Sequence, residues 1–297
     1  MSLNVTTAFV NQFSANVQML AQQGMSRLRA NVRVEEVTGE FGFFDQIGST
    51  SMVERVSRHA DTPQIDSNHT RRRVPQRTFD WADLIDKPDK VKTLIDPNSA
   101  YAQAAAMAVG RQIDDLLIEA AFATAYTGKS GSTSTSFATA SIVTTNYVGG
   151  TTDTGSGSAT GLTIDKIAKA KAILDANEVE EEDRFFVLSS AEVRTLMGTT
   201  QITSVDYNTV KALASGSIDS FLGFKFIRSE RIPNASSIRD CIAFQKKGLL
   251  LAVGMEPNIR IDERADKNYS TQVFASFCMG ATRMEEERVV KVRCASA

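Results

Sequence analysis

The spacing of apolar residues predicts a helical arm at the start of the 297-residue chain. Within residues 1–30, large apolar side chains recur every three to five positions, as expected for one face of an amphipathic helix. These side chains are Phe9, Phe13, Val17, Leu20 and Met25. Asn and Gln occupy much of the other face, so the arm needs a partner surface to lie on.

The next pattern is typical of extended chain. Residues 49–56 and 71–81 alternate partially between apolar and polar positions, and a polar, turn-rich segment separates them. Together they predict a long β-hairpin within residues 49–95. Such a hairpin is marginal in water when isolated, so something else must support it.

The strongest helix signal follows this hairpin. Asp96 is suited to the N-cap and Pro97 to the first helical position. From Tyr101 to Phe122 the chain is rich in Ala and Leu at helical spacing. At 1.5 Å per residue this helix would be roughly 35–40 Å long, enough to span a domain.

Residues 127–161 are dominated by Ser, Thr and Gly, which predicts a surface excursion outside the core. Thr163 then caps a second helix, a buried-type strand covers 184–188, and Ser189 precedes a short helix over 191–197. This alternation indicates an α/β-like subdomain. The last third is rich in strands, expected at 224–227, 241–244, 248–253, 258–261, 274–281 and 287–292.

Composition narrows the function classes. The chain has 33 Lys and Arg against 35 Asp and Glu, a net charge of −2, which argues against bulk electrostatic binding of nucleic acid. Hydrophobic residues make up 42% of the chain, enough for a sizeable core. We expect neither a membrane span nor a secretory signal, because the sequence has no apolar run of about 18 residues and no charged n-region. The odd cysteine count indicates free thiols in a reducing compartment.

Candidate catalytic groups lack the required context. Gly128-Lys129-Ser130 resembles the end of a phosphate-binding loop, but it follows a helix instead of opening one, so Gly128 is interpreted as a helix-ending residue. His59 and His69 lie ten residues apart without the paired spacing of a zinc site. The acidic runs at 114–115, 178–183 and 285–287 are interpreted as solvated charge. We therefore predict no catalytic, metal or cofactor site and a protein that is not an enzyme.

A basic cluster in the predicted hairpin is the most distinctive polar feature. It permits contact with nucleic acid, pairing with carboxylates of a neighbouring subunit, or protection of an exposed strand edge by charge. We favour pairing, so we expect Arg72→Glu to hinder assembly while the subunit still folds. The candidates for contacts between subunits are Arg71, Arg72, Arg73, Arg77, Glu54 and Arg55.

The order of these parts resembles the major capsid proteins of tailed bacteriophages, which have the HK97-like fold. Residues 96–122 resemble the spine helix of that family. Gly223 to Pro233 resembles the strand and turn G-φ-x-φ-x-x-S-x-x-φ-P of such coats, and Gly280 to Val292 resembles the closing motif G-x-x-R-x-x-x-x-x-V-V-x-I.

The resemblance implies an α+β subunit with an N-terminal arm (1–48) and an extended hairpin loop (49–95). It also implies a peripheral domain with the spine helix and the Ser/Thr/Gly-rich excursion (96–161), an axial domain (162–253) and return strands of the peripheral domain (254–297). In that family the arm and the loop drape over neighbouring subunits. Some relatives join subunits covalently through a loop lysine, but residues 49–86 contain no Lys, so that chemistry is not expected here.

The resemblance further implies a shell of pentamers and hexamers that encloses double-stranded DNA and contacts it weakly on the inner face. A portal and a separate scaffolding protein would be further partners, with assembly in the cytoplasm of the bacterial host and a final location in the virion. Two alternatives stay open: an encapsulin-type compartment shell, and an α/β nucleotide-binding enzyme that would use Gly128-Lys129-Ser130.

Overall fold

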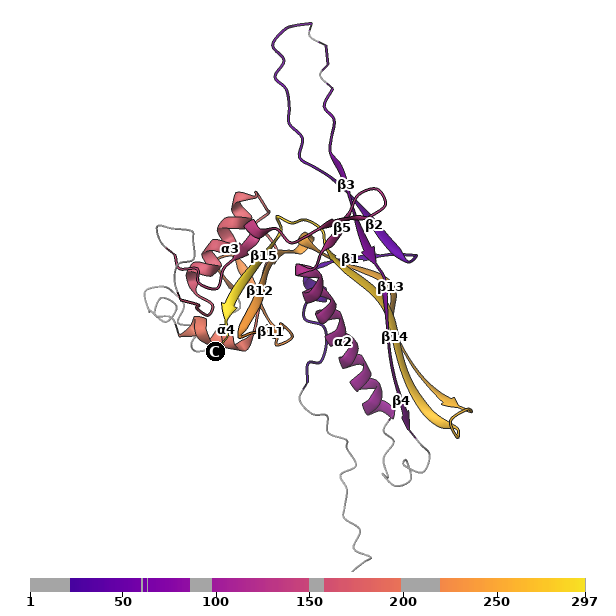
Figure 1. Ribbon diagram of the computed structural model, residues 1–297. Coiled ribbons are helices and arrows are strands. Elements are labelled where there is room, and N and C mark those ends of the chain that lie inside the picture. The colour runs from indigo at the N-terminus through magenta and orange to yellow at the C-terminus, as the bar shows by residue number, and fades with distance from the viewer. Residues whose placement is uncertain are drawn as a thin grey trace, which may run out of the picture.

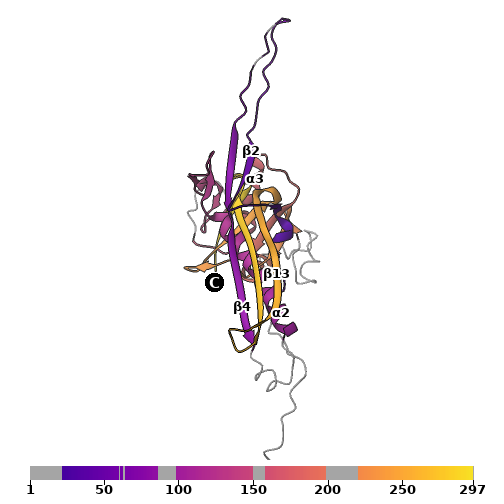
Figure 2. The same ribbon diagram turned by 90° about the vertical axis from the view of Figure 1, so that its right-hand side faces the viewer.

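The computed structural model describes residues 22–59, 61–62, 64–85, 98–149, 158–198 and 220–296. These residues form a mixed α+β subunit of two lobes, with a long helix beside one lobe and a loop that projects beyond both (Figure 1). In the side view the subunit is narrow, and the loop continues the line of the long strands (Figure 2). The predicted caps Asp96 and Pro97 lie outside the described residues.

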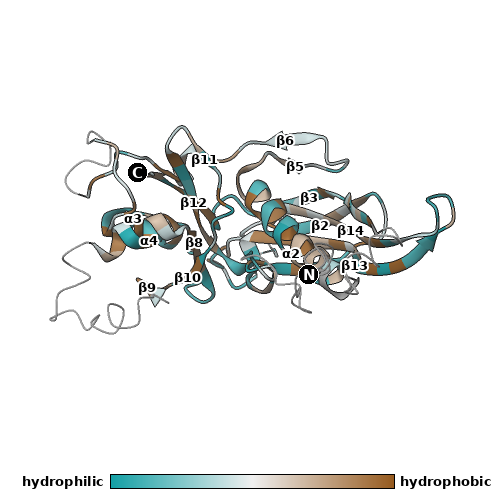
Figure 3. Cartoon of the chain, turned by 90° about the horizontal axis from the view of Figure 1, so that it is seen from below, coloured by the Kyte–Doolittle hydropathy of each residue, from teal (hydrophilic) through white to brown (hydrophobic). Residues whose placement is uncertain are grey.

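The first lobe is a four-stranded sheet in the order β1-β13-β14-β4, covered by the long helix. Its elements are β1 (Arg33–Glu36), β13 (Leu249–Arg264), β14 (Ser270–Arg283), β4 (Arg77–Ile85) and α2 (Asn98–Phe122). β13 and β14 form an antiparallel hairpin with register shifts around Met255, and its tip is hydrophilic (Figure 3). α2 has 25 residues, which confirms the predicted long helix.

The second lobe is a seven-stranded sheet with two helices. The strand order is β7-β15-β12-β8-β10-β9, and β11 pairs with β12. The strands are β7 (Ile142–Val143), β8 (Arg184–Leu188), β9 (Ser220–Phe221), β10 (Phe224–Arg228), β11 (Asn234–Ala235), β12 (Ile238–Gln245) and β15 (Val289–Ala295). The helices are α3 (Ile164–Ala176) and α4 (Ser190–Met197). Their predicted caps are confirmed: the Thr163 side chain accepts from the Lys166 amide, and Ser189 and Glu192 form a capping box.

A third sheet supports the projecting loop. It has the order β2-β3-β5-β6 and contains β2 (Phe41–Ile47), β3 (His69–Pro75), β5 (Ala125–Thr127) and β6 (Thr133–Thr135). Residues 48–68 connect β2 to β3, and their described part contains no strand. Single 3₁₀ turns complete the described secondary structure: η2 (Arg29–Asn31), η3 (Thr139–Ser141) and η5 (Lys246–Gly248).

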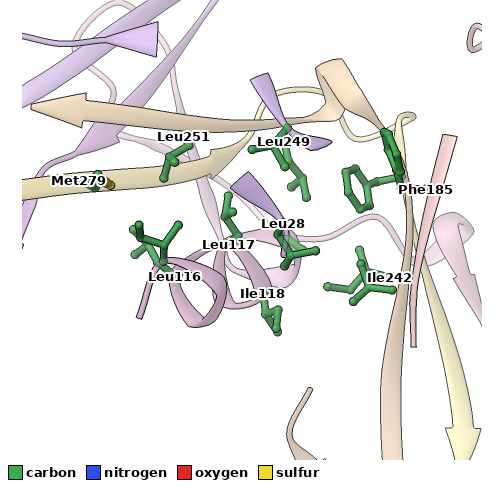
Figure 4. Packing of buried hydrophobic residues seen from close by; sticks show 14 of the residues in the cluster. Leu28, Leu116, Leu117, Ile118, Phe185, Ile242, Leu249, Leu251 and Met279 are labelled. Atoms are coloured by element: carbon green, nitrogen blue, oxygen red, sulfur yellow. The ribbon is translucent and has the colours of Figure 1, made fainter. Parts of the chain in front are cut away.

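One core joins the helix to both large sheets. Leu116, Leu117 and Ile118 of α2 meet Leu249 and Leu251 of β13, while Phe185 and Ile242 reach the same cluster from the second lobe (Figure 4). All of these side chains are buried. Because this cluster bridges the lobes, removing its apolar area from water stabilises their relative position as well as each lobe.

The predicted hairpin has a different partner. Residues 49–56 form no strand, and the expected strand 71–81 divides at Gln76 into β3 and β4. β3 pairs with β2 in a register from Phe41 opposite Pro75 to Ile47 opposite His69, whereas β4 pairs with β14. The prediction was wrong about the partner because residues 41–47 supply the aromatic side chains that let this strand pack, and residues 49–56 contain no aromatic side chain.

Two further expectations need correction. The Ser/Thr/Gly-rich stretch is not wholly outside the core, because β6 extends the third sheet and Val143 is buried where β7 pairs with β15.

β15 was expected among the return strands of the first lobe, but it pairs with β12 in the second lobe. The apolar side chains Val290, Val292 and Cys294 fix this placement, since they join the core under α3.

The long helix α2 also anchors residues 26–28, which lie within the predicted N-terminal arm. The Asp114 carboxylate is buried and accepts hydrogen bonds from the Arg27 and Leu28 amides and the Ser26 hydroxyl. One turn earlier, Gly110 lies directly under this crossing, where an added Cβ would approach the Ser26 backbone nitrogen to 2.8 Å. The mid-helix glycine thus permits close approach of the two backbones.

We expect Gly110→Ala to destabilise the subunit by about 1–2 kcal/mol, because the clash outweighs the gain in helix propensity. Urea unfolding measures this loss, and trypsin should cut faster after Arg27 in the variant. Gln103→Ala, at an exposed position of the same helix, is the control and should be nearly neutral. Unchanged unfolding and unchanged cleavage in Gly110→Ala would contradict the anchoring role.

Candidate interaction surfaces

The arginines of β3 divide between the two faces of the third sheet. Side chains alternate along a strand, so Arg72 points toward the interior while Arg71 and Arg73 point outward. Arg77 begins β4 on the other side of the bend at Gln76. The four candidates therefore do not form one basic patch.

Arg72 belongs to a buried ion network inside the subunit. It is 6% exposed, its Nη2 lies 2.7 Å from Glu286 Oε1, and its Nε donates to the Met284 carbonyl. Glu286 also accepts from Nε of the fully buried Arg283, at 2.5 Å. Arg283 in turn donates to the carbonyls of Ala121 and Ala123 at the end of α2. One carboxylate thus links the base of the projecting loop to the long helix.

This placement overturns the expected behaviour of Arg72→Glu. The variant would set a second carboxylate beside Glu286 in a buried site, where like charges strongly destabilise the fold. We now expect loss of folding, and a defect in assembly would follow from it.

Arg71 and Arg77 form exposed ion pairs within the subunit. Arg71 Nε lies 2.5 Å from Asp45 Oδ1 across the β2–β3 ladder, and Arg77 Nη1 lies 3.0 Å from Glu119 Oε2 on α2. The hydrogen bond from Arg71 holds the pKa of the Asp45 carboxyl below its usual value. Exposed pairs add little stability, so both side chains can still contact another subunit, and that role stays a prediction.

Arg73 differs from the other three candidates. Its guanidinium lies over the rings of Phe41, at 4.7 Å, and Tyr126, at 4.9 Å. It makes no ion pair with an acidic side chain in the described ranges, and its Nε is buried without a hydrogen-bond partner. Sequence reasoning missed these rings because they come from β2 and β5, although the run Phe41-Gly42-Phe43-Phe44 was a visible signal.

Glu54 and Arg55 lie on the projecting loop, far from the arginine-bearing sheet. Both are exposed, and Arg55 Nε donates to the Ser57 carbonyl. Around them Met52, Val53 and Val56 are highly exposed. A loop that presents apolar side chains to water is typical of a surface that becomes buried against a partner.

The proposed chemical motifs have structural positions that do not suit catalysis. Gly128, with φ of +90°, lies in the turn between β5 and β6, so it neither ends α2 nor precedes a helix as a phosphate loop requires. His59 lies in the loop and His69 begins β3. No group of three or more His, Cys, Asp or Glu side chains within the described residues could hold a metal ion.

The acidic runs are less solvated than expected. Asp114 and Glu286 are buried or nearly so, in the anchor and the ion network, and Asp115 pairs with Arg231. Glu180 accepts from Arg288 and Lys247, and the hydrogen bond from Arg288 lowers the pKa of its carboxyl to about 2. These carboxylates connect distant segments of the chain: Asp114 binds backbone amides and a hydroxyl, and the other three pair with basic side chains.

A buried lysine connects three further segments. Lys166 of α3 is fully buried and donates from Nζ to the carbonyls of Thr145 at 2.8 Å, Thr160 at 2.7 Å and Arg293 at 3.0 Å. Thr145 follows β7, Thr160 precedes α3, and Arg293 lies in β15. Lys166 therefore joins these three segments.

Comparison with known proteins identifies the family. A family model described as phage capsid protein matches residues 5–296, nearly the whole chain. The chain belongs to the phage capsid protein family. It is a structural capsid protein, located in the virion, with the HK97-like fold. The match favours neither the compartment shell nor the nucleotide-binding enzyme.

Solved capsid structures share the fold of this capsid protein. The capsid of Ralstonia phage GP4 superposes with a TM-score of 0.75 at 10% identity, covering 97% of this chain and 96% of that one. The capsid of cyanophage P-SCSP1u gives 0.72 at 15% identity, covering 99% and 95%. The head of Helicobacter pylori bacteriophage KHP40 gives 0.69 at 10% identity, covering 99% and 98%. No curated protein matches the chain.

The capsid protein's described helices give no sign of a membrane span. None of them is both long and apolar enough to cross a bilayer. Its three cysteines are free thiols, with Cys241 and Cys294 buried and Cys278 partly buried.

Proposed function

We propose that this capsid protein assembles with many copies of itself into a closed icosahedral shell that encloses double-stranded phage DNA. The observation that carries the proposal is the family match together with elements that cannot be stable alone. The loop of residues 48–68 projects beyond both lobes, and the tip of the β13–β14 hairpin forms the far end of the first lobe (Figure 1). Both expose large apolar side chains such as Val56 and Ile261. Neighbouring copies would cover them.

In this arrangement the domains take the roles implied by the family. The second lobe gathers around the centre of pentamers and hexamers, the first lobe lies at the periphery, and the N-terminal arm and the projecting loop reach adjacent subunits. A portal and a separate scaffolding protein are the expected partners. Contact with DNA on the inner face is weak, since the chain's net charge is only −2.

Electron microscopy and sedimentation of the purified protein test the proposal, alone and after co-expression with the other head proteins of the phage. We expect shells or capsomers, and nuclease-resistant DNA in particles taken from infected cells. Monomers or small oligomers at high concentration, without shells even in the presence of the head proteins, would contradict it.

A further inference from the structure

The guanidinium of Arg73 is fixed in place while its hydrogen-bonding capacity is left unused. Arg71, Arg72 and Arg77 each have a carboxylate partner within the subunit. Arg73 has none among the described residues, and its Nε is shielded from water without an acceptor. Buried donors of this kind normally have a partner, so an acceptor is missing from the isolated subunit.

Its surroundings hold Arg73 in one orientation. Phe41 and Tyr126 cover the guanidinium within 5 Å, and Phe43 stands directly opposite Arg73 in the β2–β3 ladder. Gly131 packs against the stem, because a Cβ there would come within 2.6 Å of the Arg73 Cβ and Cδ atoms. A guanidinium confined in this way loses little conformational freedom when its planar edge meets a carboxylate.

The surface around Arg73 is apolar and partly exposed. Phe41, Phe43 and Tyr126 are 36%, 44% and 37% exposed on the outer face of the third sheet. Aromatic side chains and an arginine are the residues that dominate the energetics of protein interfaces. This face, called here the Arg73 face, thus fits a carboxylate flanked by apolar side chains.

The projecting loop of the same chain has that complementary chemistry. Glu54 is exposed, and no hydrogen bond or ion pair is found for it within the described part of the chain. Its neighbours Met52, Val53 and Val56 are exposed by 101%, 60% and 92%. The segment 52–56 therefore presents Glu54 among three unburied apolar side chains, and its one basic residue, Arg55, is turned to the Ser57 carbonyl of its own loop.

Geometry excludes pairing within one subunit. Glu54 lies seven residues beyond the end of β2 at Ile47, so an extended chain carries it about 23 Å from the sheet. The loop points away from the body in both views (Figures 1 and 2), whereas Arg73 lies within β3 at its base. The carboxylate must come from a different copy.

We propose that the Arg73 face binds residues 52–56 of a second copy of this chain, with the Glu54 carboxylate on the Arg73 guanidinium. This inference rests on the proposed self-assembly and names the contact that orders it. The apolar side chains of the loop cover Phe41, Phe43 and Tyr126 and exclude water from the ion pair, which strengthens it.

Charge exchange tests the pairing. Arg73→Glu and Glu54→Arg should each reduce the yield of shells by about tenfold or more, because either variant places like charges together. The double variant should recover a substantial part of the yield. Lys129→Glu, an equal change of charge in the exposed β5–β6 turn of the same sheet, is the matched control and should assemble normally.

Urea unfolding of each variant separates assembly from folding. If Arg73→Glu fails to fold, Arg73→Lys replaces it, since lysine keeps the charge but lacks the planar fork and should still lower the yield. Normal yield from a folded Arg73 variant, or a double variant no better than the singles, would overturn the inference. Normal shells that lack DNA would also overturn it by assigning Arg73 to nucleic acid. Failure of the wild-type protein to assemble would instead count against the proposed function.

Discussion

Replacing Glu286 by alanine is expected to lower the free energy of unfolding of the subunit by about 3–5 kcal/mol. Glu286 is the only carboxylate that the structure shows beside Arg72 and Arg283, of which Arg283 is fully buried. Both guanidiniums already have one buried nitrogen without a partner. Without the carboxylate, two positive charges would remain in a site of low polarity with no compensating charge.

Urea denaturation of Glu286→Ala and the wild-type subunit measures the loss. Glu287→Ala provides a matched control one residue away, because Glu287 is exposed and its loss should change stability by less than about 0.5 kcal/mol. Since the network joins β3 to the end of α2, protease sensitivity should also rise at the base of the projecting loop. Equal stability of the two variants would show that the network contributes nothing.

Local signals in the sequence predicted α2, α3 and α4 well. The helix expected within residues 1–30 falls largely outside the described residues, and its described part, residues 22–30, forms no α-helix. The α2 helix was found from helix-forming residues at regular spacing, and the caps Thr163 and Ser189 marked α3 and α4 because a side-chain acceptor is needed where amides lack partners. Most strands of the last third were also located, but the two expected at 248–253 and 258–261 are a single strand, β13, with register shifts around Met255. Each of these features depends on residues close together in the chain.

Pairing between distant strands could not be predicted in the same way. β3 carries little apolar surface apart from Val74, so its pairing with β2 depends on Val74 and Phe44 packing with Leu250 and Met284 in one small core. Likewise, β15 follows β14 directly but joins the other lobe, because its alternate side chains fill the core under α3. Which sheet a strand joins is decided by the complementary face that it finds in three dimensions.

The sequence identified the arginines of residues 71–77 as a candidate site, but it did not show which contacts each arginine makes. A run of three arginines indicates exposed charge, yet strand alternation buries the middle one and a glutamate 214 positions away neutralises it. The distinction of Arg73 depends on Phe41 and Tyr126, from two other strands. No spacing rule within residues 71–77 contains that information.

Replacing Lys166 by methionine is expected to destabilise the subunit by about 2–3 kcal/mol at neutral pH. Methionine fills a similar volume but cannot donate to the carbonyls of Thr145, Thr160 and Arg293. The loss is moderated because the Thr145 and Thr160 carbonyls each keep a backbone donor, from Thr160 and Ala295. Lys171→Met, the same change on the same helix at a partly exposed position, should have a much smaller effect.

The pH dependence of this difference reports the titration of the buried Lys166 amine. Burial lowers the pKa of Lys166 below its ordinary value of 10.5, and the nearby Cys294 and Cys241 thiols offset this only partly. Between the lowered pKa and 10.5 the unfolded chain binds more protons than the folded one, so the free energy of unfolding rises with pH in that window. Lys166→Met lacks this contribution, whereas other titrating groups are common to both proteins. Wild-type stability should therefore increase relative to the variant as the pH rises toward 10.5, and a gap that narrows over this range would contradict the assigned role of Lys166.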